Sequence, residues 1–462
     1  MAGELRARVC SEHGRLRKVL VHTPGKERLA RQTEGRPDLR TAALAQLAEI
    51  QAEHAGLKAR LVGALGAGSV LELTALLREI FDGDTQRRRR ILAEILGEST
   101  GAFLAGLEAG GRALGEVEPE ALVEALVVSS SPSLLWVRDP AMCTPAGLIV
   151  HEMAQAHRRR EPALLRAILR HHPAFAEDSV FLDLTDGAGI GGANHGTKDA
   201  TVDWNLLDGG NTLVLGPGAI AVGAPWPGAL EAFALESWAR RVLLAETDAR
   251  IDRVDRIYLV HVPLPFGHLD AVFNPFAPGC ALAMPYLFGG PEPISRRDIG
   301  GALRDYRRWA RSAGSADPRP DRLAPRDFEG AGQVETWARD PSRPGEITRL
   351  SARRSFVEQL VEDGWLDPDH IAWIGGCRED HASPTSHLGA ALREQGQQAG
   401  NLLVLGPDEV VISDHNPGTR RSMERVMARA GRTSVLRPLP VKALAACYGG
   451  PRCLTLPLLR SE

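Results

Sequence analysis

A change in the pattern of apolar residues near residue 130 constrains the fold more than any other sequence feature. Residues 38–118 contain no proline, and their apolar residues recur three and four positions apart. That spacing places the apolar side chains on one face of a helix, so we predict a run of helices, broken near Gly66 and Gly83. After Pro132, short β-rich runs alternate with helical stretches. This alternation is typical of an α/β fold.

The β-rich runs give an expected order of elements. The first expected strand is 16–22, which a Thr-Pro-Gly turn follows. Further strands are expected at 134–137, 213–222, 257–262, 402–412 and 434–439. Helices are expected at 229–244, 354–363 and 419–430. The stretch 289–345, rich in Gly, Pro and Arg, is interpreted as a surface excursion that contains one helix.

Two of the β-rich runs repeat each other. Residues 211–222 and 401–412 both begin with Asn, continue through an apolar run to Gly-Pro, and end in a second apolar run. Each reads as strand, turn, strand, and a helix is expected after each. The repeat indicates several similar ββα modules. A single recurring hairpin also arises by coincidence, so the repeat alone does not fix the fold.

Charge and hydropathy exclude several classes of partner. Lys and Arg total 55 against 58 Asp and Glu, a formal net charge of −3, so no global field favours nucleic acid or an anionic membrane. The basic run 87–90 is interpreted as a solvated helix face. No apolar run approaches the ~18 residues of a membrane span, and the N-terminus lacks a signal-peptide pattern. We therefore expect a cytoplasmic protein that binds neither nucleic acid nor membrane.

The cysteines are sparse and irregularly spaced. In a reducing compartment they are better interpreted as buried thiols or a nucleophile than as a disulfide framework. No pair has zinc-finger spacing, so no structural metal is expected. The six residues are Cys10, Cys143, Cys280, Cys377, Cys447 and Cys453.

Four short segments combine polar side chains with apolar or glycine-rich surroundings, as at strand ends. Each alone has a structural explanation: a turn with a local ion pair, a hairpin turn, a structural histidine, or a small buried thiol. Together they form a chemical set. The segments are Trp136-Val-Arg-Asp139-Pro140, Leu207-Asp208-Gly-Gly-Asn211, Gly267-His268-Leu-Asp270 and Gly449-Gly-Pro-Arg-Cys453.

The set matches what attack on a guanidinium carbon requires. That carbon is flanked by three nitrogens and is a poor electrophile, so an enzyme needs carboxylates to bind the cation, a thiolate to attack and a histidine to transfer protons. Asp139 and Asp270 supply the carboxylates, Cys453 the thiol and His268 the imidazole. The glycine pair before Cys453 allows the backbone to approach the thiol closely.

These segments, in this order, resemble the arginine deiminases of the guanidino-group modifying superfamily. The tail from Gly449 to Pro457 is similar to the motif that holds the family's nucleophilic cysteine. The segments around Asp139 and His268 resemble its guanidinium-binding aspartates and catalytic histidine. The similarity runs from about residue 8 to 458 and is weakest in 25–130 and 285–350.

The resemblance implies a fold and its division into domains. Arginine deiminases have a five-module α/β propeller with a helical domain inserted after the first module. Here the propeller would comprise residues 1–37 and 131–462, and the helical insertion residues 38–130.

The sequence also departs from the family pattern. Asp208 stands where most members have glutamate; it can still orient His268, and Asp-Gly-Gly is the form found in dimethylarginine dimethylaminohydrolases. Asn211 replaces a charged residue at a substrate-binding position. Of the arginines that bind the substrate carboxylate, Arg158 is retained, none is present near Trp226-Pro227, and Tyr448 replaces a third. The chemical centre is retained while the carboxylate clamp is reduced.

The resemblance implies hydrolysis of L-arginine or a related guanidino compound to a ureido product and ammonia, through an amidino intermediate on Cys453. The alternatives are an amidinotransferase, a dimethylarginine dimethylaminohydrolase-like enzyme, and a catalytically degenerate binding protein. No metal or organic cofactor is expected. The partner would be a small guanidino substrate, and self-association into a homo-oligomer is left open.

Overall fold

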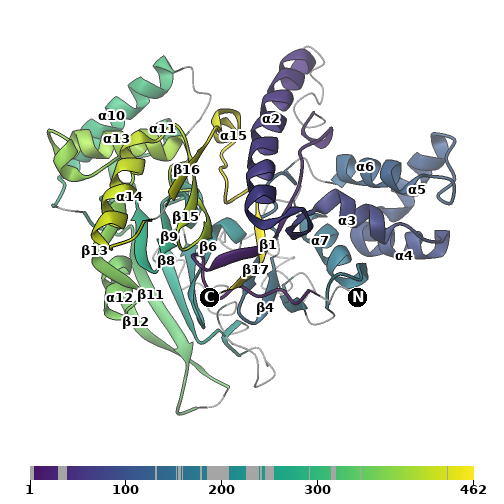
Figure 1. The fold of residues 1–462 in the computed structure, drawn as a ribbon, viewed down its shortest axis with the longest axis horizontal. Coiled ribbons are helices and arrows are strands. Elements are labelled where there is room, and N and C mark those ends of the chain that lie inside the picture. The colour runs from purple at the N-terminus through teal and green to yellow at the C-terminus, as the bar shows by residue number, and fades with distance from the viewer. Residues whose placement is uncertain are drawn as a thin grey trace.

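The structure is a computed structural model of the chain, and it shows a mixed α/β fold built from small sheets and helices (Figure 1). It describes residues 5–29, 39–130, 133–151, 153, 158, 160–176, 179–184, 208–224, 239, 242–244, 254–290, 292–313, 319–343, 345–433 and 435–461.

The strands are short, and in five of them every residue is buried. In chain order they are β1 (Arg15–Val21), β2 (Val70–Glu72), β3 (Ala141–Thr144), β4 (Gly147–Val150), β5 (Val180–Asp183), β6 (Thr212–Gly216), β7 (Ala219–Ala224), β8 (Arg256–His261), β9 (Phe273–Ala277), β10 (Gly279–Ala283), β11 (Gln333–Arg339), β12 (Ile347–Ser355), β13 (Leu366–Trp373), β14 (Leu403–Gly406), β15 (Glu409–Ser413), β16 (Val435–Leu439) and β17 (Leu456–Ser461).

Within the described residues these strands form five separate sheets that share one pattern of pairing. Their orders are β17-β1-β2, β3-β4-β5, β12-β11-β8-β7-β6, β13-β10-β9 and β14-β15-β16. Each contains an antiparallel pair whose second strand also pairs in parallel with a third: β17/β1/β2, β3/β4/β5, β6/β7/β8, β9/β10/β13 and β14/β15/β16. A parallel neighbour requires a long crossover connection. The repeat between 211–222 and 401–412 therefore belongs to a pairing pattern that all five sheets have.

Some of the helices form the crossover connections between the parallel strands. The helices are α2 (Arg40–Leu65), α3 (Leu73–Ile80), α4 (Thr85–Leu96), α5 (Thr100–Ala109), α6 (Pro119–Ser130), α7 (Arg160–His171), α10 (Arg296–Ser312), α11 (Arg319–Arg322), α12 (Phe356–Glu362), α13 (Pro384–Gly396), α14 (Pro417–Arg429) and α15 (Lys442–Ala446). For example, α7 lies between β4 and β5, and α14 between β15 and β16.

The proline-free segment is helical, and it breaks where expected. Helix α2 ends at Leu65 before Gly66, which has φ 83°, and Gly83 separates α3 from α4. Figure 1 shows α3 to α6 at one side of the molecule, whereas α2 stands beside β1 and β16. The apolar residues of α3, α4 and α6 share a core with those of α7 and β3–β5, and α2 packs in a different cluster. Whether residues 38–130 form a domain stays a prediction.

Three sequence interpretations need correction. Residues 134–137 lie in turns and not in a strand. The stretch 289–345 contains β11, which pairs on both sides within the five-stranded sheet, so it is not only a surface excursion. Arg88, in the basic run, is buried and donates to the carbonyl oxygens of Phe81, Leu114 and Val117. Most of the expected helix 229–244 lies outside the described residues.

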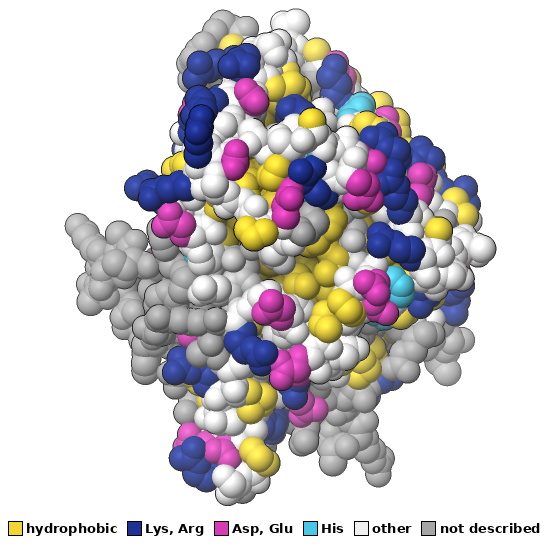
Figure 2. Space-filling view, turned by 90° about the vertical axis from the view of Figure 1, so that its left-hand side faces the viewer, with side chains coloured by type: hydrophobic (Ala, Val, Ile, Leu, Met, Phe, Trp, Pro, Cys, Tyr) yellow, Lys and Arg dark blue, Asp and Glu magenta, His cyan; other side chains and the backbone are white. Residues whose placement is uncertain are grey.

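Charged side chains of both signs are interspersed on the face that Figure 2 shows. Among the helices that the structure describes, none has the length and apolarity needed to cross a bilayer.

Candidate active site

The predicted site residues occupy equivalent places in the fold. Asp139 lies just before β3, Asp208 before β6, His268 and Asp270 before β9, and Cys453 before β17. Each of these strands is the first of the antiparallel pair in its sheet. The remaining sheet has the same kind of loop before β14, and this loop contains Asn401. Five loops, one from each sheet, therefore carry the candidate residues.

Cys453 is buried, with 7% of its surface exposed. The side-chain amide of Asn401 contacts both its sulfur and its backbone N–H. The Asn401 Nδ2 atom lies 2.9 Å from Cys453 Sγ and 3.1 Å from Asp270 Oδ2. The Asn401 Oδ1 atom accepts from the backbone N–H groups of Arg452 at 3.0 Å and Cys453 at 3.1 Å. One amide thus fixes both the thiol and the backbone that carries it.

Asn401 was missed in the sequence, although the internal repeat contained a signal for it. It opens the second repeat at the position that Asn211 holds in the first. Asn211 Oδ1 accepts from the backbone N–H of Leu269 at 3.1 Å, next to His268. Each repeated asparagine therefore binds the loop of a candidate catalytic residue. The predicted role of Asn211 in substrate binding stays a prediction.

Asp270 belongs to a buried chain of charges. Its Oδ2 atom lies 2.8 Å from Arg452 Nη1 and 3.8 Å from Cys453 Sγ. Arg452 Nη2 pairs with Glu12 Oε1 at 2.8 Å and donates to the Thr212 carbonyl at 2.7 Å. Burial raises the pKa of Glu12, but the charges of Arg452 and Arg138 outweigh it and lower the pKa to about 2.

Asp139 is held by Arg158. The Arg158 Nη1 atom lies 2.7 Å from Asp139 Oδ2, and the same guanidinium binds Glu161 through two contacts of 2.8 and 2.7 Å. All three side chains are buried. Arg158 was predicted to bind a substrate carboxylate. In this arrangement a substrate carboxylate could bind Arg158 only by displacing the carboxylate of Asp139 or Glu161.

His268 lies between two carboxylates. Its Nε2 atom is 3.6 Å from Asp208 Oδ2, and its Nδ1 atom is 3.9 Å from Asp139 Oδ1; 25% of the imidazole is exposed. Burial by itself would lower the pKa of His268. Asp208 and the charges of Asp139 and Asp270 have a larger effect in the opposite direction and raise the pKa to about 9. The imidazole is therefore protonated at neutral pH.

A bound cation would change the state of the thiol and of two carboxylate oxygens, Asp139 Oδ1 and Asp208 Oδ1. Burial and the charges of Asp270 and Asp139 raise the pKa of Cys453, so the thiol is protonated without a ligand. Asp139 Oδ1 and Asp208 Oδ1 are buried and have no hydrogen-bond partner among the described residues. A bound cation with several N–H groups would satisfy these oxygens and favour the thiolate.

Two glycines allow close packing here. A Cβ atom at Gly210 would lie 2.1 Å from His268 Nδ1, and one at Gly449 would lie 2.1 Å from the Trp136 ring. Any side chain at Gly210 would displace the imidazole. At Gly449 the absence of a side chain leaves room for the indole ring of Trp136. The neighbouring Gly450 packs against Asn401.

The site shows no arrangement of metal ligands. In the described part of the chain, no group of three His, Cys, Asp or Glu side chains is placed to hold a metal ion. All six cysteines are free thiols, as the sequence predicted.

Comparisons with known proteins agree on one family. A model of the family described as arginine deiminase matches residues 120–275. The arginine deiminase of Bacillus cereus (strain B4264) is 23% identical over 334 residues, covering 72% of this chain and 62% of that protein. The arginine deiminase of Listeria monocytogenes serotype 4b (strain F2365) is 24% identical over 333 residues, with the same coverage. The match therefore spans less than two thirds of these relatives.

The solved structures that match the chain are more distant in sequence. A dimethylarginine dimethylaminohydrolase in adduct with S-methyl-L-thiocitrulline is 11% identical, with 96% of this chain and 99% of that chain covered and a TM-score of 0.41. Unliganded AgrE is 13% identical, with 72% and 31% covered and a TM-score of 0.36. Residues 120–275 thus match the arginine deiminase family, and the chain is similar to curated arginine deiminases as a divergent relative.

Proposed function

We propose that the protein hydrolyses a guanidino compound, L-arginine or a relative of it, to a ureido product and ammonia through a covalent intermediate on Cys453. The observation that carries this proposal is the unpartnered Oδ1 atom of Asp139, buried near His268. A buried acceptor without a donor costs about 1–3 kcal/mol. A guanidinium presents several N–H donors, one of which would satisfy this oxygen.

The first half of the reaction uses the charge of the substrate. A guanidinium bound by Asp139 and Asp270 lowers the pKa of the nearby thiol, which releases its proton to solvent. The thiolate of Cys453 adds to the guanidinium carbon. The imidazolium of His268 then donates its proton to one amino group, the C–N bond breaks and ammonia leaves. An amidino-thioether and a neutral imidazole remain.

The second half returns the site to its starting state. Neutral His268 accepts a proton from water as the oxygen adds to the amidino carbon. The C–S bond breaks and Cys453 leaves as thiolate. The ureido product gives up its extra proton, and Cys453 takes up a proton to become the thiol again. Asp208, 3.6 Å from the imidazole, stabilises the imidazolium that forms again. None of the steps written here needs a cofactor.

The proposal is tested by trapping the intermediate. Mass spectrometry of His268→Ala mixed with L-arginine should detect an amidino adduct on Cys453, or turnover should fall, because the variant lacks both the acid for the departing ammonia and the base for the attacking water. Cys453→Ala should lose turnover, while Cys447→Ala, a nearby partly exposed thiol, should retain it. Full activity in Cys453→Ala would contradict the proposal.

The rival chemistries use the same residues and differ in product. Ammonia release without added amine distinguishes hydrolysis from amidino transfer, which needs an acceptor. Methylamine release from methylarginines, with arginine inert, would favour the dimethylaminohydrolase-like alternative that the Asp208-Gly-Gly sequence supports. A degenerate binding protein would turn over no guanidino compound.

The same proposal extends to the architecture. Five sheets with one pairing pattern, each with a candidate residue in its leading loop, support a five-module α/β propeller around the site, with residues 38–130 as its helical insertion. Six free thiols support a reducing compartment, the cytoplasm.

A further inference from the structure

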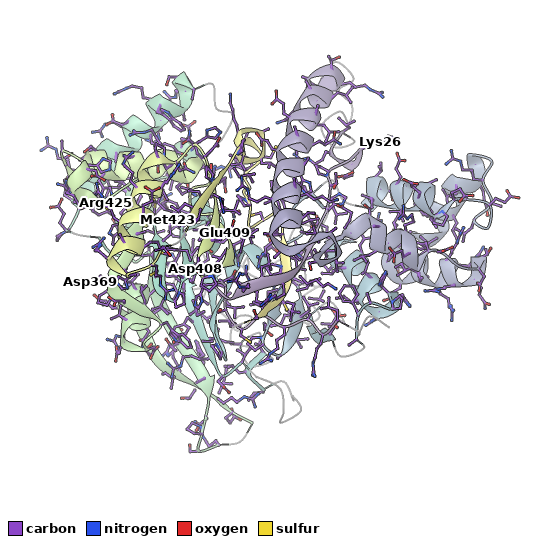
Figure 3. All side chains as sticks on the ribbon, in the orientation of Figure 1. Lys26, Asp369, Asp408, Glu409, Met423 and Arg425 are labelled. Atoms are coloured by element: carbon purple, nitrogen blue, oxygen red, sulfur yellow. The ribbon has the colours of Figure 1, made fainter. Side chains whose placement is uncertain are left out.

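A cavity of about 460 Å³ lies where helices α3 and α6 meet the end of β1. The turn after β1, the end of β2 and residues of both helices line it, and none of the candidate catalytic residues is among the described residues of its lining. Lys26, labelled in Figure 3, lies on that turn and pairs with Glu124 of α6 at 2.5 Å. A cavity of this size holds a small organic molecule.

His22, which follows β1 directly, lines this cavity and is 1% exposed. Its Nε2 atom lies 3.0 Å from Glu27 Oε1. A carboxylate only accepts hydrogen bonds, so Nε2 carries the hydrogen, and Nδ1 of the neutral imidazole is an acceptor. Nδ1 has no hydrogen-bond partner among the described residues, and Glu72 Oε1 lies 3.9 Å from it, beyond hydrogen-bond distance. This buried acceptor therefore lacks a donor.

Two carboxylates flank the imidazole, and both are ionised at neutral pH. Burial raises the pKa of Glu27, but hydrogen bonds, the first of them from His22, lower it more. Burial also raises the pKa of Glu72, and hydrogen bonds from Lys58 and the Thr23 backbone N–H lower it more. His22 Nδ1 and the two carboxylates thus place acceptors and negative charge together.

The rest of the lining is acidic on balance and has an apolar wall. Two further glutamates face the cavity along with two cations, so that four carboxylates stand against two positive side chains; these residues are Glu120, Glu124, Lys26 and Arg78. The apolar wall includes Val123 and Val127 of α6, which are both buried. In the described chain no three His, Cys, Asp or Glu side chains are placed to hold a metal ion. The lining therefore suits an organic cation that has N–H donors and an apolar body.

We propose that this cavity binds a small aliphatic ammonium ion at a site separate from the candidate active site. One N–H of the ammonium group donates to His22 Nδ1 and another to Glu72 Oε1, because two acceptors 3.9 Å apart can both lie about 2.9 Å from one nitrogen. The alkyl chain then packs against Val123 and Val127. The bound ion connects the end of β1 to α6. This inference goes beyond the proposed function and does not depend on it.

The test titrates n-butylammonium chloride calorimetrically into the 462-residue chain. The comparison ligand is 1-butanol, which has the same alkyl chain and no charge, and it should bind at least tenfold more weakly. His22→Phe keeps a flat ring and removes the acceptor. It should weaken butylammonium binding roughly tenfold to a hundredfold, the effect of losing a hydrogen bond to a charged group.

A second variant tests the space in the cavity and keeps the proposal testable if His22→Phe does not fold. Ala75→Leu places a larger side chain in the cavity from α3 and should abolish butylammonium binding. Ala105→Leu, at an exposed alanine of α5, is the matched control and should leave binding unchanged. Unchanged binding in Ala75→Leu would overturn the proposal.

The candidate active site is acidic as well, so Asp139→Asn checks where the ammonium ion binds. We expect this variant to bind butylammonium as the unsubstituted chain does. Loss of binding in Asp139→Asn, no binding to the unsubstituted chain, or equal affinity for 1-butanol would each overturn the inference. None of these results depends on turnover of a guanidino compound, so the proposed function is decided by its own test.

Discussion

The side-chain amide of Asn401 bonds to Cys453 at both ends: Nδ2 lies 2.9 Å from the sulfur, and Oδ1 accepts from the Cys453 backbone N–H at 3.1 Å. An N–H directed at sulfur stabilises the thiolate more than the thiol. The contact between Oδ1 and the Cys453 backbone N–H fixes the position of the loop that carries Cys453. We therefore expect Asn401 to act as a positioning residue for Cys453, the proposed nucleophile.

Substitution Asn401→Ala should slow turnover by roughly tenfold to a hundredfold, because it removes a donor to charged sulfur worth about 1.5–3 kcal/mol. The readout specific to positioning is the pH dependence of Cys453 labelling by iodoacetamide, whose midpoint should move to higher pH. Asn416→Ala, at another buried asparagine, should leave that midpoint in place. An unchanged midpoint in Asn401→Ala would show that the amide serves only the fold.

The pH dependence follows from His268. Its pKa is raised to about 9 in the folded protein, above the ordinary value near 6.5. The protonated form that donates to the leaving amine is thus present at neutral pH and lost as pH rises through about 9. The corresponding stability is fully present below about 6.5 and is lost over the same rise. We expect kcat to fall above pH 9.

Asp208→Asn tests the cause of that shift. Removing the carboxylate beside Nε2 should move the falling limb of the rate profile to lower pH, since burial then lowers the pKa of His268 with less opposition. Asp183→Asn, at a carboxylate that pairs with Arg166 away from His268, is the control. A limb that stayed near pH 9 in Asp208→Asn would assign it to another group.

The pair of Glu12 and Arg452 should be important for stability. Glu12→Gln leaves the buried guanidinium of Arg452 with less compensation, and breaking a buried pair costs about 3–5 kcal/mol. Urea unfolding should show a lower midpoint with an unchanged slope. Glu424→Gln, in the surface pair with Arg420, should leave the midpoint unchanged, because exposed pairs contribute little. A similar midpoint for both variants would contradict this.

Gly210→Ala tests the close approach of backbone to imidazole. The new methyl group would lie 2.1 Å from His268 Nδ1, so the ring must shift from its place between Asp139 and Asp208, and we expect at least a tenfold loss of kcat. Gly68→Ala, with no atom within 4 Å of the added carbon, should be neutral. Retained activity in Gly210→Ala would mean that the ring tolerates the shift.

The sequence predicted what depends on local pattern and on short motifs. The proline-free helices, the hairpins at 211–222 and 401–412, and α14 lie where periodicity and turn residues indicated them. Residues 134–137 are apolar because they are buried in a turn, and an apolar run alone does not distinguish a buried turn from a strand. Strand β11 was missed because its neighbours along the chain are rich in Gly, Pro and Arg.

The candidate site was less predictable where it depends on packing. Asp139, Asp208, His268, Asp270 and Cys453 could be predicted as candidates because their short motifs contain the chemistry; their roles stay predictions. Asn401 carries no chemistry of its own, and only its distance from Cys453 reveals its role.

The sheet that presents Cys453 pairs the two ends of the described chain, β1 with β17, and Arg452 binds Glu12 across 440 residues. On the ribosome, the first strand must therefore wait for the synthesis of the 440 residues that separate Glu12 from Arg452 before its partner exists. Contacts of such long range form slowly and late. The nucleophile would be assembled only when folding is nearly complete, so that a nascent or truncated chain would carry the histidine and the aspartates but no working thiol.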